Sequence, residues 1–275
     1  MYIRKAINKI NQYLHKPSFS SNDITIGKNV RFGKNVVFNC KKVIIGDGCI
    51  FMDNVKVDST EFRIGDYGTI YQNCFFPGPG KLSIGHNFWL GNNSIIDAQG
   101  DTIIGNNVGI GAHSQLWGHM KYGDLMYGCQ YNSIKHLSIG NDVWLVGHNL
   151  VSPVKIEDRS MALMGSLITK NMFKDRTYGG SPAKDLTDKI GSQFAITSVK
   201  EREIFFNKKI DQFCSQKKIK YSDFFNTIIL DSDLVITGKT NFNLSKRKYT
   251  KEGTSIEMEF IRYLLPDVKF IPQLE

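Results

Sequence analysis

The residues best suited to chemistry in this 275-residue chain are two histidines, His113 and His119, which lie six positions apart. Imidazole changes charge near neutral pH, so a positioned histidine can take a proton from a hydroxyl or amine and then release it. His119 opens a polar, glycine-containing segment of about residues 117–138, and loops of this kind often carry function. Asp97 and Asp124 are the two carboxylates that we consider as partners orienting the ring.

A histidine base needs two companions to act in catalysis: a hydrogen-bond donor for the developing negative charge, and a surface that positions the substrates. The sequence contains neither a Rossmann fingerprint nor a Walker loop, which argues against nucleotide-driven chemistry. The five cysteines are odd in number and show no Cys-x-x-Cys spacing, so we predict reduced core residues and no disulfide framework or zinc knuckle.

Composition indicates a soluble globular protein, with 41% hydrophobic and 22% charged residues. The formal net charge is +9, but the lysines are scattered, and the one tight basic run, residues 246–248, is typical of a solvated loop. We therefore expect no nucleic-acid surface, whereas a phosphate-rich coenzyme is compatible with the charge. No apolar run approaches the roughly 20 residues of a spanning helix, and the N-terminus lacks a secretory signal, so we expect a cytoplasmic protein.

The candidate residues lie in a six-residue repeat. From Ile26 onward an aliphatic or aromatic residue recurs about every six positions, often followed by glycine, and the fourth residue after it is often small. The clearest Ile-Gly pairs begin at Ile26, Ile45, Ile64, Ile84 and Ile104. A period of six is not helical and is not the alternation of a hairpin. It indicates a short strand, a turn and another short strand.

Three such hexads close a triangular coil of roughly eighteen residues, and each coil stacks about 4.8 Å above the last through parallel strand hydrogen bonds. The large apolar residue fills the interior, while glycine or asparagine provides positive φ at the corners. We expect about seven or eight coils. A β-sandwich would place its turns irregularly, and the constant phase of the hexads argues against that alternative.

Two further segments make a family resemblance specific. The segments are the run Ile139-Gly-Asn-Asp-Val-Trp-Leu-Val-Gly147 and the ending Gly165-Ser-Leu-Ile-Thr-Lys170 with Gly180-Ser-Pro-Ala-Lys184. Together with the hexads, these segments resemble the hexapeptide-repeat acyltransferase superfamily, in its sugar O- and N-acetyltransferase branch. The likeness covers about residues 24–186. It implies a left-handed parallel β-helix, acetyl-coenzyme A as co-substrate without a metal, and a homotrimer with each coenzyme between neighbouring prisms. The hexads themselves do not establish handedness.

The resemblance also implies roles for individual residues. Because the family's catalytic histidine opens a loop, His119 is the predicted general base and His113, inside a hexad, is its rival. Trp144 matches a tryptophan that walls the pantetheine tunnel. The other predicted coenzyme contacts are Gly147, Gly165, Ser166, Lys170 and Lys184. The predicted acceptor contacts are Asp97, Trp117, Tyr122 and Asp124. The acceptor implied is a sugar, nucleotide sugar or oligosaccharide of bacterial surface polysaccharide, and O- versus N-acetylation stays open.

The flanks differ from the repeat. Residues 1–22 read as a basic amphipathic helix and linker that cap the first coil, with weak membrane contact as the alternative. Residues 23–186 form the catalytic β-helix, and residues 187–275 form a small α/β accessory region. Within that region we predict helices at 192–218 and 255–265 and strands at 234–237 and 268–271.

Two other functions remain open at this stage. A γ-class carbonic anhydrase shares the solenoid, and His86, His113 and His119 are its possible zinc ligands, although their spacing does not match that family. A non-catalytic β-helix scaffold is the second alternative, because function depends on sites and not on folds.

Overall fold

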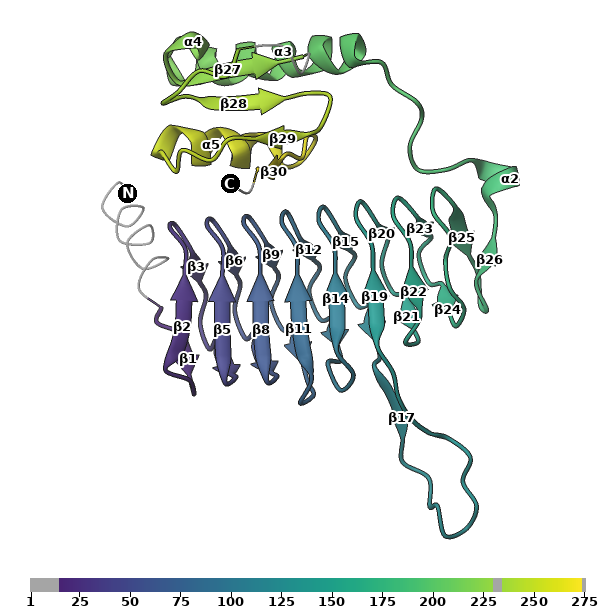
Figure 1. The fold of residues 1–275 in the computed structure, drawn as a ribbon. Coiled ribbons are helices and arrows are strands. Elements are labelled where there is room, and N and C mark those ends of the chain that lie inside the picture. Colours follow the sequence, from purple (N-terminus) through teal and green to yellow (C-terminus); the bar gives the residue numbers. More distant parts are fainter. Residues whose placement is uncertain (1–14, 230–233, 274–275) are drawn as a thin grey trace, which may run out of the picture. The chain divides into compact units, whose positions relative to one another are not determined.

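The structure, a computed structural model, describes residues 15–229 and 234–273 (Figure 1). The chain divides into two compact units, Met1–Phe194 and Ala195–Glu275. Most of the predicted N-terminal capping helix lies outside the described residues. None of the helices in the two described ranges is both long and apolar enough to span a bilayer.

The first unit is a three-sided parallel β-helix, and we call its sides faces A, B and C. Face A contains β1 (Ser18–Phe19), β4 (Val37–Asn39), β7 (Lys56–Asp58), β10 (Phe75–Phe76), β13 (Ile95–Ile96), β16 (Gln115–Leu116), β21 (Leu150–Val151) and β24 (Leu167–Ile168). Face B contains β2 (Asp23–Ile26), β5 (Lys42–Ile45), β8 (Glu61–Ile64), β11 (Lys81–Ile84), β14 (Thr102–Ile104), β19 (Leu137–Ile139) and β22 (Lys155–Ile156). Face C contains β3 (Arg31–Phe32), β6 (Ile50–Phe51), β9 (Thr69–Ile70), β12 (Trp89–Leu90), β15 (Gly109–Ile110), β20 (Trp144–Leu145), β23 (Met161–Ala162), β25 (Thr177–Gly179) and the antiparallel β26 (Lys184–Asp185).

Successive strands of the chain pass from face A to B to C, so each coil up to β23 contributes one strand to each face, and the last coil, which begins at β24, has only an isolated bridge at Met172 on face B. The predicted mainly β, parallel β-helix class is therefore confirmed. Eight strands on face A among the described residues also agree with the predicted number of coils.

The hexad residues fill the interior. In the N-terminal coils the interior is aromatic: Phe62 is fully buried, with its ring 5.6 Å from that of Phe38 and 6.1 Å from that of Phe76. Towards the C-terminal end the same stack becomes aliphatic, as in Ile96 and Leu116 of face A. Because every interior position touches the coils above and below, burial of these rings holds the stack together.

The corners have the predicted positive φ angles, on asparagine at seven positions and on glycine or other residues elsewhere. At the corner between faces C and A, Asn35, Asn54, Asn73 and Asn93 occupy successive coils, and each amide nitrogen of the first three donates to the next asparagine at 3.0 Å. Asparagine tolerates the left-handed region and can bond along the corner. The corner ladder therefore adds side-chain hydrogen bonds to the strand ladders.

The predicted loop insertion is ordered as an arm. β17 (His119–Lys121) and β18 (Asn132–Ile134) pair antiparallel, and Figure 1 shows this ribbon projecting from the corner between faces A and B. Its tip exposes large side chains, including Tyr122, Met126 and Tyr127.

The short helix α2 (Thr187–Ile190) closes the first unit, and the second unit is α/β. The second unit contains α3 (Val199–Lys217), α4 (Tyr221–Phe224), β27 (Phe225–Ile228), β28 (Thr240–Asn243), β29 (Lys248–Tyr249), α5 (Ser255–Leu264) and β30 (Ile271–Pro272). α3 begins with a capping box between Ser198 and Glu201. The predicted helix at 255–265 is confirmed, and the one at 192–218 is confirmed except that it begins seven residues later, at Val199. The predicted strand at 268–271 overlaps β30 only at Ile271, and the predicted strand at 234–237 is wrong. Leu234 and Val235 are exposed there, and the sheet instead uses β27 and β28, whose Phe225 and Phe242 are buried.

The five cysteines are thiols, as predicted, but only three of them belong to the core. Cys40, Cys49 and Cys74 are buried in the β-helix. Cys129, in the arm, and Cys214, in α3, are half-buried, so their prediction as core residues was wrong. Cys129 lies in the arm and Cys214 lies on α3, so neither is in the interior of the β-helix.

Phe62→Ala is expected to lower the free energy of unfolding of the β-helix by about 3–5 kcal/mol, because it opens a cavity between stacked rings. Urea unfolding followed by circular dichroism measures the change. The matched control is Arg63→Ala, one residue along the same strand and pointing outward, which should shift stability by no more than about 0.5 kcal/mol. Equal losses in the two variants would contradict this account of the core.

Candidate active site

The candidate site forms where two neighbouring coils turn from face A to face B. β13 and β16 pair in parallel with Ile96 opposite Leu116, so the residues that follow each strand meet at the same corner. Asp97 follows β13, and Trp117, Gly118 and His119 follow β16. The insertion therefore begins one coil after Asp97, at the same corner as its carboxylate.

Asp97 and His119 form a close pair. His119 Nδ1 lies 2.5 Å from Asp97 Oδ2, and the same oxygen accepts the backbone N–H of Gly118 at 2.8 Å. The other carboxylate oxygen accepts the N–H of Gln99 at 2.9 Å. The Asp97 side chain is 1% exposed, whereas that of His119 is 32% exposed. A buried carboxylate therefore holds a histidine whose other edge can reach solvent or a substrate.

This geometry determines the histidine's chemistry. A carboxylate can only accept a hydrogen bond, so Nδ1 of His119 carries the proton and Nε2 of the neutral ring keeps its lone pair. A base must present that lone pair, and the buried aspartate also stabilises the imidazolium formed after proton uptake. The arrangement is that of a general base with an orienting partner.

The local backbone makes the pair possible. A Cβ added to Gly118 would lie 3.1 Å from the Asp97 carbonyl oxygen and 3.1 Å from the Gly100 nitrogen. Glycine at this position thus permits the close approach of the two corners. The Asp97 carbonyl also accepts the Thr102 hydroxyl at 3.3 Å, which ties the carboxylate's turn to the start of β14.

The other predicted acceptor contacts divide into near and distant residues. The Trp117 ring stands edge-on to His119 with centroids 6.1 Å apart, so it walls the site. Tyr122 and Asp124 lie out in the arm, where Tyr122 is fully exposed and Asp124 caps the N–H of Met126 at 2.8 Å. Of the two carboxylates considered as orienting partners, the structure pairs Asp97 with the histidine. Its buried oxygens face protein donors, which makes it a positioning residue.

The rival histidine lies at another corner. His113 has φ 59° between faces C and A, in the series of corner asparagines, and its exposed ring stacks on His148 with centroids 4.9 Å apart. His86 occupies the corner between faces B and C, where its Nδ1 accepts the N–H of Asp66 at 2.9 Å. His86, His113 and His119 thus occupy three different corners of one prism, and a single chain does not bring them together around a metal.

Face C carries an exposed aromatic pair. Trp144 of β20 and Trp89 of β12 both point outward and are exposed, and Gly109 of β15 lies between them in register. A Cβ on Gly109 would approach Trp144 Cδ1 at 3.6 Å. Sequence reasoning missed Trp89, although it precedes the inward Leu90 just as Trp144 precedes the inward Leu145.

The remaining predicted coenzyme contacts surround the last coils. Gly147 and Gly165 lie at the corner between faces C and A with φ of 146° and 73°. Ser166 is fully buried and its hydroxyl donates to the Leu163 carbonyl at 2.7 Å, so it faces the interior. Lys170 follows β24 at the corner between faces A and B, whereas Lys184 lies on β26 at the end of face C. That corner is opposite face C, so the two lysines lie on opposite sides of the prism.

Fold and site together define a parallel β-helix protein with an aspartate-oriented histidine at one corner. No family model matches the chain. Among solved structures, it is similar to the polysialic acid O-acetyltransferase OatWY, at 20% identity over 66% of this chain and 93% of that chain, with a TM-score of 0.47. It is also similar to the polySia-specific acetyltransferase NeuO, at 19% identity over 67% and 87% of the two chains, with a TM-score of 0.39. A hexapeptide-repeat acetyltransferase from Vibrio cholerae O1 biovar eltor, complexed with acetyl-coenzyme A, shares 15% identity over 71% and 79%, with a TM-score of 0.29. At these identities and scores the comparison by itself assigns no activity.

The pairing with Asp97 should be visible in the tautomer of His119 without any activity assay. We expect nitrogen NMR of the neutral ring to show the proton on Nδ1, and Asp97→Asn, whose amide can donate, to move it to Nε2. His86 is the internal control, because its Nδ1 accepts a backbone N–H and requires the opposite tautomer in both proteins. An Nε2-protonated His119 in the parent protein would contradict the assigned geometry.

Proposed function

We propose that this chain is an acetyl-coenzyme A-dependent acyltransferase that modifies a sugar hydroxyl or amine, acting in the cytoplasm in bacterial surface polysaccharide biosynthesis. The observation that carries the proposal is the pair of Asp97 and His119, which leaves Nε2 available as a base. OatWY and NeuO, to which the chain is similar, are acetyltransferases of polysialic acid, and the similar Vibrio cholerae acetyltransferase is complexed with acetyl-coenzyme A, which supports this choice of reaction.

The reaction follows from the pair. His119 Nε2 takes the proton of the acceptor hydroxyl or amine as the acceptor atom bonds to the thioester carbonyl carbon. Asp97 stabilises the resulting imidazolium through Nδ1. When the carbon–sulfur bond breaks, the imidazolium returns the proton to the departing coenzyme thiolate. The proton is balanced and the histidine ends as it began.

The coenzyme contacts are proposed from exposure and position. Trp144 offers an exposed ring on face C, and Gly165 is exposed at the neighbouring corner, with no heavy atom within 4 Å of an added Cβ. Gly147 is buried and its N–H donates to Asn149 Oδ1 at 3.0 Å, so it offers no free N–H to the coenzyme. Lys170 and Lys184 are exposed cations for the phosphates. Ser166 can take part only through its backbone, because its side chain is buried.

The positions of these groups lead to a proposed homotrimer. His119 lies at the corner between faces A and B, and Trp144 lies on face C, on the opposite side of the same prism. One active site can contain both only if the corner of one chain meets face C of the next. Such a contact joins two different surfaces and generates a ring, and three triangular prisms turned by about 120° close it.

The general-base role predicts a specific kinetic result. His119→Ala should lower kcat by about a hundred- to ten-thousand-fold, because it removes proton transfer, and should leave the dissociation constant of acetyl-coenzyme A nearly unchanged. Steady-state kinetics and calorimetry measure the two quantities.

His113→Ala is the matched control, since it removes an exposed histidine from a different corner and should keep at least about a tenth of the activity. An inactive His113 variant with an active His119 variant would reassign the base and leave the arm as a cover over the acceptor.

The proposed assembly is tested by the mass in solution. Light scattering should give three times the 31.2 kDa of one chain. Mixing inactive His119→Ala and Trp144→Ala proteins should restore part of the activity, because some sites then combine an intact His119 with an intact Trp144 from different chains. A monomer with full activity would exclude a shared site.

A further inference from the structure

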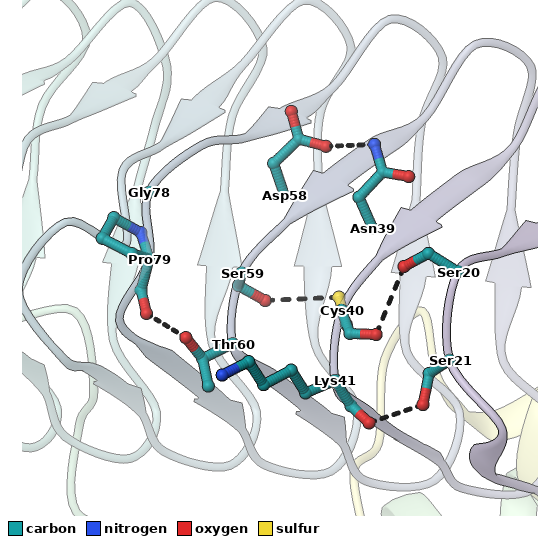
Figure 2. Close-up of a pocket in the computed structure, with 10 residues that line it drawn as sticks. All are labelled: Ser20, Ser21, Asn39, Cys40, Lys41, Asp58, Ser59, Thr60, Gly78 and Pro79. Carbon is teal, nitrogen blue, oxygen red and sulfur yellow. Dashed lines mark hydrogen bonds between the residues drawn. The ribbon is translucent and has the colours of Figure 1, made fainter.

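An open groove lies along the same corner of the prism as the candidate base, at its N-terminal end. It has a volume of about 720 Å³ and lies between faces A and B of the first coils (Figure 2). Polar side chains from three successive coils contribute to its lining, together with Cys40, Gly78 and Pro79. They are Ser20, Ser21, Asn39, Lys41, Asp58, Ser59 and Thr60. None of these residues takes part in the proposed reaction, so the groove needs its own explanation.

The hydroxyls of the groove are oriented by the next coil. Ser21 Oγ donates to the Lys41 carbonyl at 2.5 Å, and Thr60 Oγ1 donates to the Pro79 carbonyl, as Figure 2 shows. A hydroxyl has one donor and two acceptor lone pairs. Ser21 Oγ also accepts the backbone N–H of Asp23 at 2.9 Å, so it keeps one lone pair, and Thr60 Oγ1 keeps acceptor capacity once its proton is engaged. The groove therefore presents hydrogen-bond acceptors to a ligand.

Asn39 and Asp58 continue this pattern on face A. The amide nitrogen of Asn39 donates to Asp58 Oδ1 at 2.7 Å, which leaves the amide oxygen as the exposed group of Asn39. Asp58 Oδ2 lies 2.6 Å from Lys56 Nζ, so its charge is compensated, and a carboxylate still has further acceptor sites.

The floor of the groove carries no charge. Cys40 is buried there, its sulfur lies 3.5 Å from Ser59 Oγ, and burial raises the pKa of its thiol, so the thiol stays neutral. Lys41 adds one exposed ammonium at the rim. A surface rich in acceptors and containing a carboxylate suits a ligand with many hydroxyl donors and disfavours a phosphate.

The groove ends one coil from the candidate active site. Gly78 and Pro79 are its last lining residues, and their corner is bonded to that of Asp97, because Ala98 N donates to the Pro77 carbonyl at 2.6 Å and Gly80 N donates to the Ala98 carbonyl at 2.7 Å. With strands about 4.8 Å apart, the Ser59 corner lies two coils and about 10 Å from the Asp97 corner, and the Ser21 corner lies four coils and about 19 Å away.

We propose that this groove is a remote subsite for a glycan chain, so that the acceptor is an oligosaccharide or polysaccharide that runs along the corner while one of its units meets His119. The inference rests on the proposed acyltransferase function for the unit that reacts. The binding of the remaining units depends only on the groove. A sugar chain supplies the repeated hydroxyl donors that the row of acceptors requires, and it has the length to reach the base several coils away.

The test varies the acceptor length and the groove together. Acceptors are neutral oligosaccharides, glucans among them, of about one to six units, chosen to span the four coils. The full-length protein is compared with Asn39→Ala/Asp58→Ala. The matched control is Glu61→Ala, because Glu61 is 27% exposed and paired with Arg63, as Asp58 is 29% exposed and paired with Lys56, but it lies on face B outside the groove.

We expect kcat/KM to rise with acceptor length in the parent protein. The double variant should lose about tenfold on the longest acceptors through KM and should not change with single sugars, since about two hydrogen bonds far from the reacting atoms are removed. Glu61→Ala should behave as the parent. Equal values for short and long acceptors, or an equal loss in the control, would overturn the subsite.

Binding separates the two proposals. If the parent transfers no acetyl group to any acceptor, the proposed function fails, and the subsite is then judged by calorimetry with the longest oligosaccharides. Binding at millimolar concentration that the double variant weakens and the control does not would support the groove as a glycan site without that reaction. No binding by any oligosaccharide would overturn it.

Discussion

The constraint on which the rest of this structure depends is closure of the triangular coil. Every strand must lie directly over the strand of the previous coil, so that ladder hydrogen bonds form and the large hexad side chains meet in the interior. This leaves the three corners as the places where chain length can vary. The coils lengthen at the corner between faces A and B, from Ser59–Thr60 to Pro77–Gly80 and then to the arm after β16. Groove and candidate base therefore share one edge.

Closure also explains how residues distant in the chain become a site. Asp97 and His119 are separated by a whole coil, and the parallel pairing of β13 with β16 brings them together. The turn at Asp97 is tied to its neighbours on both sides by backbone hydrogen bonds, so the carboxylate does not need to be ordered by a substrate. Holding the base in advance reduces what the reaction must reorganise.

The sequence predicted the parts of the molecule that repeat and missed those that do not. The phase of the hexads predicts that Ile64 and Leu116 point inward, because each occupies the same position in its coil as an inward residue of the neighbouring coil. The asparagines at the corners follow from the same repeat. The partner of His119 could not be chosen, because an irregular coil of 35 residues between Ile104 and Ile139 hides which corner lies over which. Trp89 carried a readable signal in its outward hexad position. In the second unit no repeat exists, and the strand at 234–237 was misplaced because two exposed aliphatic residues imitate a buried run.

The oriented histidine lies at a corner opposite the face that carries the exposed tryptophans, and this separation affects what one chain can do alone. A single prism presents its oriented histidine on one side and its two exposed tryptophans on the other, so the groups of the proposed acyl-transfer site are divided in space within one chain. Joining the corner of one chain to face C of another would bring a base, an aromatic wall and the end of the polar groove to one boundary. The coenzyme and the glycan would then approach that boundary from different chains, the coenzyme along face C and the glycan along the corner groove. Such a division would separate the two substrates until the boundary forms, and it would allow the proposed acceptor groove to change at the A/B corner without altering the proposed coenzyme surface.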